Sequence, residues 1–346
     1  EEDNIIGGAA IDNMINMFCG EPIQGIQREI VELMKKMNPD MEKANAFFPA
    51  SYLLAWESVL KDLPVKIFTS THINKVNVSN NKIESIAFNN QKFYSKTYID
   101  ATGNGDLAYL AGCPMAYGRE SKNQFEESFA PQNADKQVQQ CTLMYSVRRK
   151  PDCNHQEPAN WVFYDNQNYL IWGPTVTVED TTDSNQLQTA YKKALNMLLQ
   201  EVEEWQKKGF YVFQIAPKIG VRESRRLIGD YILNQKDIMD KKTFNDSIAV
   251  VNYSIDPWDP DGNPLHKGEN VETPFYQIPY RALISKNISN IIVAGRCISA
   301  THVANSSCRV MPIAAVTGHA AGVAAAISKG NFFDVDIKKL RNLLTE

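Results

Sequence analysis

The sequence has no strong excess of charge of either sign and no long hydrophobic run. Its 36 Lys and Arg residues nearly balance its 40 Asp and Glu residues, which gives a net charge of −4 at pH 7. A chain without a basic excess lacks the electrostatic footprint of nucleic-acid binding. A membrane-spanning helix needs about 20 apolar residues, and the alanine-rich stretch 313–327 is shorter and contains Thr317, His319 and two glycines. We therefore expect neither nucleic acid nor a membrane among the partners.

Cysteines are few, and none stands in a Cys-x-x-Cys pair. The six cysteines are scattered along the chain, which favours reduced thiols and no metal site. No secretory signal pattern precedes the first elements, and the sequence opens at Glu1 as if it had been cut. We expect a cytoplasmic protein whose partners are a small-molecule substrate and, in a homo-oligomer, further copies of the chain.

The composition that remains is that of a globular protein with a sizeable core. Of the 346 residues, 43% are hydrophobic and 22% are charged. This length is greater than that of one ordinary domain and predicts two.

Periodic patterns predict a mixture of helices and strands. Apolar residues recur at helical spacing over residues 23–37, 50–61 and 184–208, the last behind a capping residue at Asp183 or Ser184. Alternating or continuous apolar runs predict strands at 65–68, 73–78, 83–88, 94–100, 141–147, 161–172 and 210–215. Ser79, Asn80 and Asn81 form a turn that should join the second and third of these strands in a hairpin.

The most informative segment lies near the C-terminus. Ile291–Val293 read as a buried strand that Gly295 ends, and Pro312 stands where a helix should begin. Gly318 and Gly322 are four residues apart among alanines, so one helix face is almost bare. Another backbone or a flat ligand can approach such a face closely.

Five stretches in order give a specific resemblance. They are Gly7-Gly8 after Glu1, Ile99–Asp106 with Ala111-Gly112, Gly220–Arg226, Gln277–Arg281, and Ala294–Ser299 continuing through Gly322. Together they resemble the FAD-dependent oxidoreductases of the glutathione-reductase-like superfold. The resemblance implies an α/β FAD-binding domain built from residues 1–118 and 284–346, with an inserted α+β substrate domain at 119–283.

One departure from that family concerns the phosphate-binding unit. The family opens with a strand, a Gly-x-Gly-x-x-Gly turn and a helix, and no such motif is present here. Glu1 stands six residues before Gly7, where the family places the acidic residue that binds the adenosine ribose. The resemblance thus implies an N-terminally incomplete FAD-binding domain that lacks a unit roughly 30 residues long, through truncation, a misplaced start or a natural loss of cofactor binding. Asn104 stands where the family usually has Asp.

The same resemblance implies a set of FAD-binding residues, each with a simpler alternative. Glu1 would bind the ribose or be a disordered terminus, and Gly7 and Gly8 would approach the pyrophosphate or form an ordinary turn. Ile73 aligns with the position whose main chain meets adenine, or is a core residue. The other implied positions follow the two glycine turns and open the small-residue helix: Thr102, Gly103, Gly105, Gly295, Arg296, Met311, Pro312 and Ile313. Asp106 either belongs with them or caps a helix that begins at Leu107.

Catalysis in such an enzyme requires a base for the leaving proton beside the flavin. His302 and Arg309, between the flavin-contacting strand and the helix, are the candidates for a base and an anion-binding group. The alternatives are a hydrogen-bonded structural histidine and an arginine that neutralises a phosphate or fixes the loop.

Charged and aromatic residues of the central region are the candidates for substrate binding. Arg222 and Arg225 belong to a dense cluster that anchors a substrate or a domain, or forms a salt-bridged helix face. Tyr280 and Arg281 follow Pro279 and are expected to dock the substrate domain onto the flavin domain.

The sequence thus predicts an FAD-dependent oxidoreductase that transfers hydride between a small polar organic substrate and the flavin. The alternative is a truncated or degenerate flavoprotein that serves as a non-catalytic binding or structural subunit. A dehydrogenase with nicotinamide as its only cofactor is disfavoured, because Ala294-Gly-Arg296 followed by a small-residue helix matches the flavin pattern.

Overall fold

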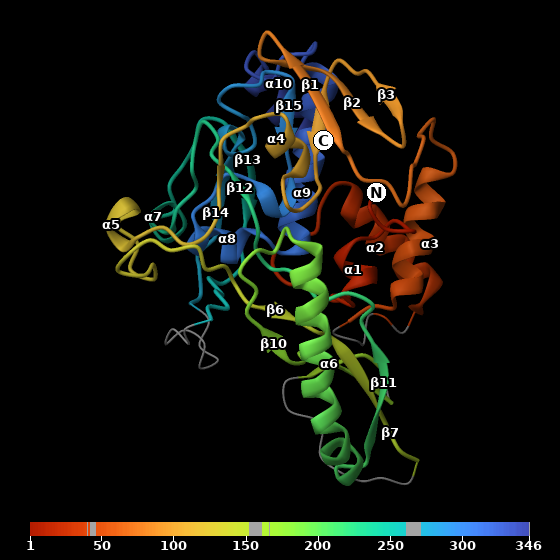
Figure 1. Cartoon of the computed structure of the whole chain (residues 1–346). Coiled ribbons are helices and arrows are strands. Elements are labelled where there is room, and N and C mark those ends of the chain that lie inside the picture. The colour runs from red at the N-terminus through yellow and green to blue at the C-terminus, as the bar shows by residue number, and fades with distance from the viewer. Residues whose placement is uncertain (40, 42–45, 152–160, 166, 261–270, 346) are drawn as a thin grey trace.

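The computed structural model describes residues 1–39, 41, 46–151, 161–165, 167–260 and 271–345. It is a mixed α/β structure with a large upper part and a narrower lower lobe (Figure 1). The upper part holds the N-terminal helices, a hairpin and the C-terminal third of the chain. The lower lobe is built around one long helix and an antiparallel sheet.

The N-terminal helices form a small core of their own. They are α1 (Ala9–Asp12), α2 (Ile26–Met37) and α3 (Pro49–Leu60), and they bury Ala10, Ile30, Met34, Phe47 and Ala55. The helical spacing that predicted α2 and α3 is confirmed, although α2 begins three residues later than expected. Gly25 precedes it with a φ of 57°, and a Cβ atom there would lie 2.5 Å from Nδ1 of His319.

The predicted hairpin is present beside these helices. Strands β1 (Lys75–Ser79) and β2 (Lys82–Phe88) pair antiparallel, and β3 (Gln91–Phe93) extends the sheet. Asn80 and Asn81 have φ values of 48° and 59°. A tight hairpin turn requires this left-handed geometry, and asparagine adopts it more readily than most residues do. The strand predicted at 65–68 is wrong: Val65 and Ile67 are 52% and 44% exposed, and the structure assigns no strand there.

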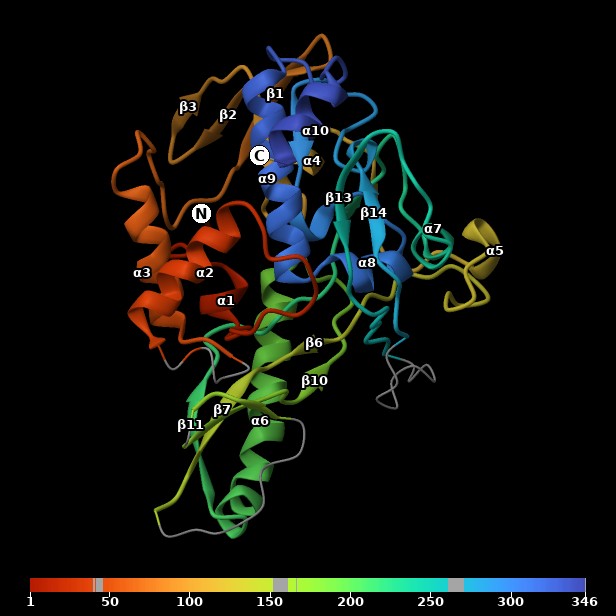
Figure 2. The same ribbon diagram turned by 180° about the vertical axis from the view of Figure 1, so that it is seen from behind.

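The centre of the upper part is a short parallel strand pair packed on the small-residue helix. Strands β4 (Tyr98–Asp100) and β15 (Ile291–Val293) pair in parallel, with Ile99 opposite Ile292. Helix α9 (Met311–Ile327) packs against this pair and runs through the middle of the molecule (Figure 2). All three residues of β15 are fully buried, so this pair and α9 form the centre of the main core.

The remaining upper elements pack around this core. Strands β13 (Ser247–Val251) and β14 (Tyr276–Pro279) form an antiparallel pair that shares the core with β15 and α9. The other elements are α4 (Asp106–Leu110), β5 (Met115–Ala116), α5 (Lys122–Phe125), β12 (Arg226–Leu227), α7 (Gln235–Met239), η3 (Tyr280–Ala282), η4 (Gly295–Cys297), α8 (His302–Cys308) and α10 (Ile337–Thr345). The predicted division at residues 118 and 283 stays a prediction.

The lower lobe confirms the strands and the long helix predicted from the central sequence. Its four-stranded antiparallel sheet has the order β11 (Phe210–Ile215), β7 (Tyr145–Arg149), β9 (Asn168–Ile171) and β8 (Trp161–Phe163). Helix α6 (Ser184–Lys207) begins at Asp183, whose side chain accepts hydrogen bonds from the backbone of Asn185 and Gln186. Strands β6 (Cys141–Thr142) and β10 (Thr175–Val176) lie between this sheet and the upper part.

No described helix is by itself long and apolar enough to cross a bilayer. Helices α8 and α9 satisfy that criterion of length and composition only as a pair, with a bend of 92° at the break between them.

Candidate cofactor and substrate site

The first turn of α9 begins where the sequence predicts, and no side chain caps its backbone N–H groups. Met311 and Pro312 begin the helix, and Val310 before them provides no side-chain cap. A helix N-terminus carries partial positive charge and suits an electron-rich ring or an anion. Gly295 lies beside this turn with a φ of 77°, and a Cβ atom on it would meet only Ala314, at 3.8 Å.

The turn after β4 is held by one buried carboxylate. Asp100 accepts hydrogen bonds from the backbone N–H and the hydroxyl of Thr102 through Oδ1, and from the backbone of Ala108 through Oδ2. Gly103 and Gly105 have φ values of 79° and 66°, so the turn requires glycine at both positions. Gly105 is the residue before α4, and Asp106 lies inside the helix instead of capping it.

Arg296 joins this turn to the strand end that carries Gly295. Its Nε donates to the backbone oxygen of Gly103 at 2.9 Å, and its Nη2 donates to Oδ1 of Asn104 at 2.6 Å. A further bond reaches the backbone oxygen of Val221. The structure thus brings the predicted residues of the two glycine turns together, and Asn104 bonds Arg296 at the position where the resembled family carries Asp.

The N-terminal residues lie at the edge of the same region. The backbone of Glu1 exchanges hydrogen bonds with Phe68 and Thr71. Burial and the charge of Glu1 raise the pKa of Asp12, at the end of α1. Gly7 and Gly8 directly precede that helix with φ values of 128° and 50°. Ile73 packs, partly buried, against the main core.

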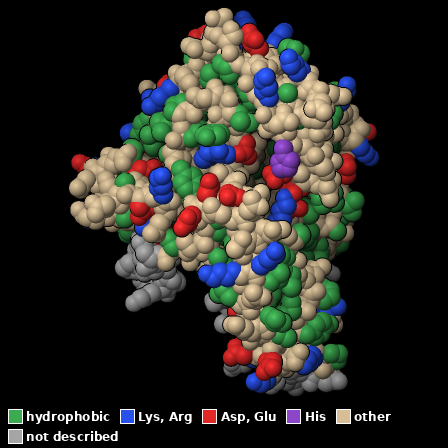
Figure 3. All heavy atoms as spheres, in the orientation of Figure 1, with side chains coloured by type: hydrophobic (Ala, Val, Ile, Leu, Met, Phe, Trp, Pro, Cys, Tyr) green, Lys and Arg blue, Asp and Glu red, His purple; other side chains and the backbone are tan. Residues whose placement is uncertain are grey.

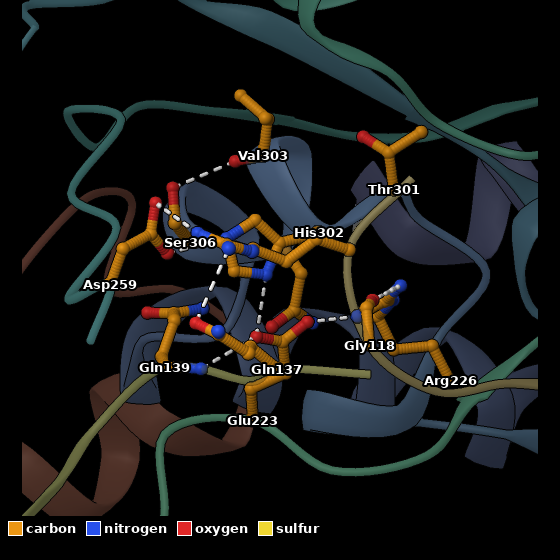
Figure 4. Close-up of polar contacts among 12 residues, drawn as sticks. Gly118, Gln137, Gln139, Glu223, Arg226, Asp259, Thr301, His302, Val303 and Ser306 are labelled. Carbon is orange, nitrogen blue, oxygen red and sulfur yellow. Dashed lines mark hydrogen bonds and ion pairs between the residues drawn. The ribbon is translucent and has the colours of Figure 1, made fainter. Parts of the chain in front are cut away.

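Both ring nitrogens of His302 are occupied by carboxylates. Nδ1 lies 2.7 Å from Oε2 of Glu223, and Nε2 lies 2.8 Å from Oδ1 of Asp259 (Figure 4). Burial alone would lower the pKa of His302, but Glu223 and Asp259 raise it to about 10. The ring is therefore an imidazolium at neutral pH and has no lone pair for a proton. This geometry favours the structural interpretation of His302 over that of a general base.

His302 belongs to a larger buried network of charges. Glu223 also pairs with Arg226, and both side chains are fully buried. Arg226 in turn bonds Glu120 at 2.7 Å and the backbone oxygen of Ala300 at 2.9 Å. His302 and Arg226 hold the pKa of Glu223 below its usual range against the effect of burial. The network ties α8 to the segment that leads into β12.

Arg222 and Arg309 lie close together, and each donates a hydrogen bond to residue 139 or 140. Arg222 donates through Nη1 to the backbone oxygen of Gln140 at 2.7 Å, and its guanidinium lies 4.1 Å from the ring centre of Trp258. Arg309 donates through Nε to Oε1 of Gln139 at 3.2 Å. Burial and the positive charge of Arg309 lower the pKa of Arg222 to about 9. The two predicted anion-binding arginines are therefore neighbours.

The remaining candidate substrate residues have protein partners. Arg225 pairs with Asp106 and stacks on Tyr109 at 4.3 Å. Tyr280 is 3% exposed and donates its hydroxyl to the backbone oxygen of Phe332 at 2.9 Å, which ties η3 to the C-terminal segment. The exposed Arg281 pairs with Asp246 at 2.9 Å, within the residues predicted as the substrate domain. These contacts favour structural roles for Arg225, Tyr280 and Arg281.

Sequence reasoning missed the partners of these groups. Glu223, Asp259 and Trp258 are not among the candidate residues that the sequence predicts. The sequence feature that could have revealed Asp259 and Trp258 is the concentration of aspartates around a tryptophan at 256–259. This segment lies close to α8 in space but about 45 residues before it in the sequence. Gln139 gave no signal. Among the described residues, no group of His, Cys, Asp and Glu is arranged to hold a metal ion.

The space-filling view shows basic and acidic side chains gathered at mid-height on this face of the molecule (Figure 3). In the part of the chain that the structure describes, Cys297 and Cys308 are both buried and form no disulfide bond.

Comparison with known proteins gives one extensive match. The family described as FAD dependent oxidoreductase matches residues 1–344. A comparison with curated protein sequences finds no significant match.

Three solved structures show distant similarity. A myxobacterial chondrochloren halogenase, CndH, titled a variant of FAD-dependent halogenases, is 11% identical with a TM-score of 0.34, over 87% of this chain and 55% of that one. Tetracycline destructase Tet(51) is 8% identical with a TM-score of 0.39, over 97% of this chain and 78% of that one. Diels-Alderase PyrE3 is 9% identical with a TM-score of 0.34, over 100% of this chain and 70% of that one. The chain thus spans little more than half of the halogenase, and scores this low carry no argument about function.

Proposed function

Because the chain belongs to the family of FAD-dependent oxidoreductases, we propose that it oxidises or reduces a small polar organic substrate by hydride transfer at FAD. The observation that carries the proposal is the convergence of the α9 N-terminus, the Gly295–Arg296 strand end and the Thr102–Gly103 turn. These residues come from segments nearly 200 positions apart. One turn near a helix end is common in proteins, but three such features brought together from distant segments suit a flat cofactor.

We further infer a glutathione-reductase-like arrangement in which the substrate region is inserted into the FAD-binding region. The parallel pairing of β4 with β15 supports this, because the two strands lie on either side of the central sequence. The antiparallel sheet with α6 supports a separate α+β region between them.

The residues present fit part of an FAD molecule. Gly295 leaves space that a Cβ atom would narrow, and the first turn of α9 presents uncapped N–H groups. Gly8 likewise has nothing within 4 Å of its Cβ position. When bound, FAD would supply a two-electron acceptor or donor at its ring. The protein would orient that ring with the α9 N-terminus and keep the Gly103 turn in place through Arg296.

The direct test is to purify the chain with added FAD and record its absorption spectrum. We expect retained, protein-bound flavin whose absorption bleaches under anaerobic reduction by a substrate. Arg296→Gln should lower the retained flavin per chain, because the two bonds that hold the turn after β4, to Gly103 and Asn104, are lost. Arg341→Gln, at an exposed position on α10, is the matched control. A protein that folds but retains no flavin contradicts the proposal.

One observation favours the alternative of a non-catalytic subunit. Strand β4 pairs only with β15 among the described strands, and Ile99 on it is 41% exposed. Parallel sheets are normally buried and have more strands than two. Absence of flavin binding in a folded, stable chain would select this alternative.

A further inference from the structure

Two arginines, a glutamine and a tryptophan form a compact cluster below the first turn of α9. Arg309 is the residue before Val310, so it lies directly at the start of that helix. Arg222 reaches the same place from the segment before β12 and stacks on Trp258. Trp258 donates its indole N–H to Oδ2 of Asp256 at 3.1 Å, which fixes the loop that faces both arginines.

The donors of this cluster exceed the acceptors that the described residues offer. Arg222 bonds the backbone oxygen of Gln140 and the hydroxyl of Thr142, both through Nη1, which leaves Nε and Nη2 without a hydrogen bond among the described residues. Arg309 makes only long contacts, at 3.2 Å to Gln139 and 3.3 Å to the backbone oxygen of Asp256. Both arginines are only partly buried, so their guanidinium groups remain accessible to an acceptor from outside.

Gln139 provides an independent observation. Its side chain is 1% exposed, and its Oε1 is oriented by the bond from Arg309. Its Nε2 is buried and has no hydrogen-bond partner among the described residues. A buried amide donor without an acceptor is unfavourable, and an anionic ligand at Arg309 would supply the missing acceptor.

The local charge selects the class of anion. Arg222 and Arg309 carry two positive charges, and Asp256, with Oδ2 3.7 Å from Nη2 of Arg309, supplies one negative charge. Arg222 makes no ion pair with a described residue. The remaining charge of the cluster is one positive charge, which a single carboxylate balances and a doubly charged phosphate exceeds. The planar guanidinium groups also match the two coplanar oxygens of a carboxylate.

We propose that Arg222, Arg309 and Gln139 bind a carboxylate group of the substrate. This inference rests on the proposed function and narrows its substrate to a small monocarboxylate. Arg309 adjoins the first turn of α9, so a carboxylate bound there holds the rest of the molecule near the region assigned to the flavin ring. Arg222 and Arg309 are therefore substrate-binding residues, whereas His302 holds Glu223, next to Arg222, and Asp259 in place.

The test measures the binding of glycolate by calorimetry at low ionic strength, with the neutral glycolamide as the matched ligand. We expect glycolate to bind and glycolamide to bind at least about tenfold more weakly, since a hydrogen bond to a charged group is worth about that factor or more. Arg222→Gln and Arg309→Gln should each weaken glycolate binding by about tenfold or more, and Arg222→Lys should lose less than Arg222→Gln. Arg341→Gln should bind glycolate as the unchanged protein does.

The outcomes separate this inference from the proposed function. Equal binding of glycolate and glycolamide by the unchanged protein overturns the inference, whatever the variants do and whether or not they fold. Tighter binding of inorganic phosphate than of glycolate overturns the carboxylate assignment. The flavin content of the same preparations is measured by absorption. Retained flavin without glycolate binding leaves the proposed function standing, and glycolate binding by a protein that retains no flavin contradicts the proposed function alone.

Discussion

His302 is the residue whose replacement should have the largest effect on stability. It lies between Glu223 and Asp259, and all three side chains are at most 2% exposed. Replacing it by glutamine leaves two buried carboxylates without the cation between them, so we expect His302→Gln to lower the free energy of unfolding by about 3–5 kcal/mol. Urea denaturation measures this value. His72→Gln, at a side chain that is 68% exposed, should change little. A His302→Gln protein of unchanged stability that has lost activity would instead support the interpretation of His302 as a base.

The same residue makes a prediction about pH. Its pKa in the folded protein, about 10, lies above the ordinary value of 6.5. The folded state therefore holds this proton more tightly than the unfolded state. The stability that His302 provides is complete below about pH 6.5 and is lost as the pH rises through 10. The difference in unfolding free energy between the unchanged protein and His302→Gln should shrink over that interval. A difference that is constant from pH 6 to 10 would contradict the assignment of the charge.

Single residues also show where sequence reasoning stops. The proximity of Arg222 and Arg309 was not predictable, because it depends on how the loop at 256–259 folds back on residues 139–140. The sequence is nevertheless informative about candidates, because residue type and a position between a strand and a helix point to His302 and Arg309. What the sequence could not provide is the partner that decides the role of each. The two carboxylates around His302 come from positions 43 and 79 residues away.

At the scale of elements, α9 offers a test with a matched pair of substitutions. Gly322 lies inside the helix, and its Cβ position has nothing within 4 Å. Gly322→Ala should therefore raise the free energy of unfolding by about 0.5–1 kcal/mol through the better helix propensity of alanine. Gly25→Ala should lower it, because that residue has a φ of 57° and its Cβ position is 2.5 Å from the His319 ring. Thermal unfolding of the two variants measures both. Destabilisation by Gly322→Ala would mean that another group occupies this face.

The elements that were predicted correctly are those specified by local chemistry. The turn residues Asn80 and Asn81 determine the hairpin, and Asp183 with an apolar stripe determines α6. The strand expected at 65–68 failed for a physical reason. A strand requires a neighbour for its backbone hydrogen bonds, and an apolar run alone does not supply one. The isolated bridges and two-residue strands around β5 and β12 likewise depend on distant partners and gave no sequence signal.

At the scale of the whole molecule, the described core is divided unevenly. The largest cluster unites the hairpin, the parallel pair, the strands β13 and β14 and the C-terminal helices. Two other clusters surround α6, and one of them also includes Met14 and Ala46 from the N-terminal region. The candidate FAD-binding residues lie in the upper part, and the arginine cluster lies where the upper part meets β6. A ligand of the upper part should therefore stabilise the two parts to different degrees.

Amide hydrogen exchange with and without FAD tests this division. A ligand that binds only the folded state stabilises it by mass action, by about 2.7 kcal/mol at a concentration one hundred times its dissociation constant. Amide exchange that occurs through local unfolding is slowed only in the segments that the ligand orders. We expect FAD to slow exchange in residues 7–12, 100–110 and 293–298 and in the first turns of α9, and to leave the end of α6 near Trp205 unchanged. That end packs against Phe210 and Tyr145 in a cluster of the lower lobe, far along the chain from every candidate cofactor residue.

Riboflavin, which lacks the adenosine and the pyrophosphate, should protect α9 and the Gly295 turn and leave residues 7–12 unprotected. Protection confined to α6 and β11 would place the cofactor in the lower lobe and would contradict the role given to the bare, N–H-rich end of α9.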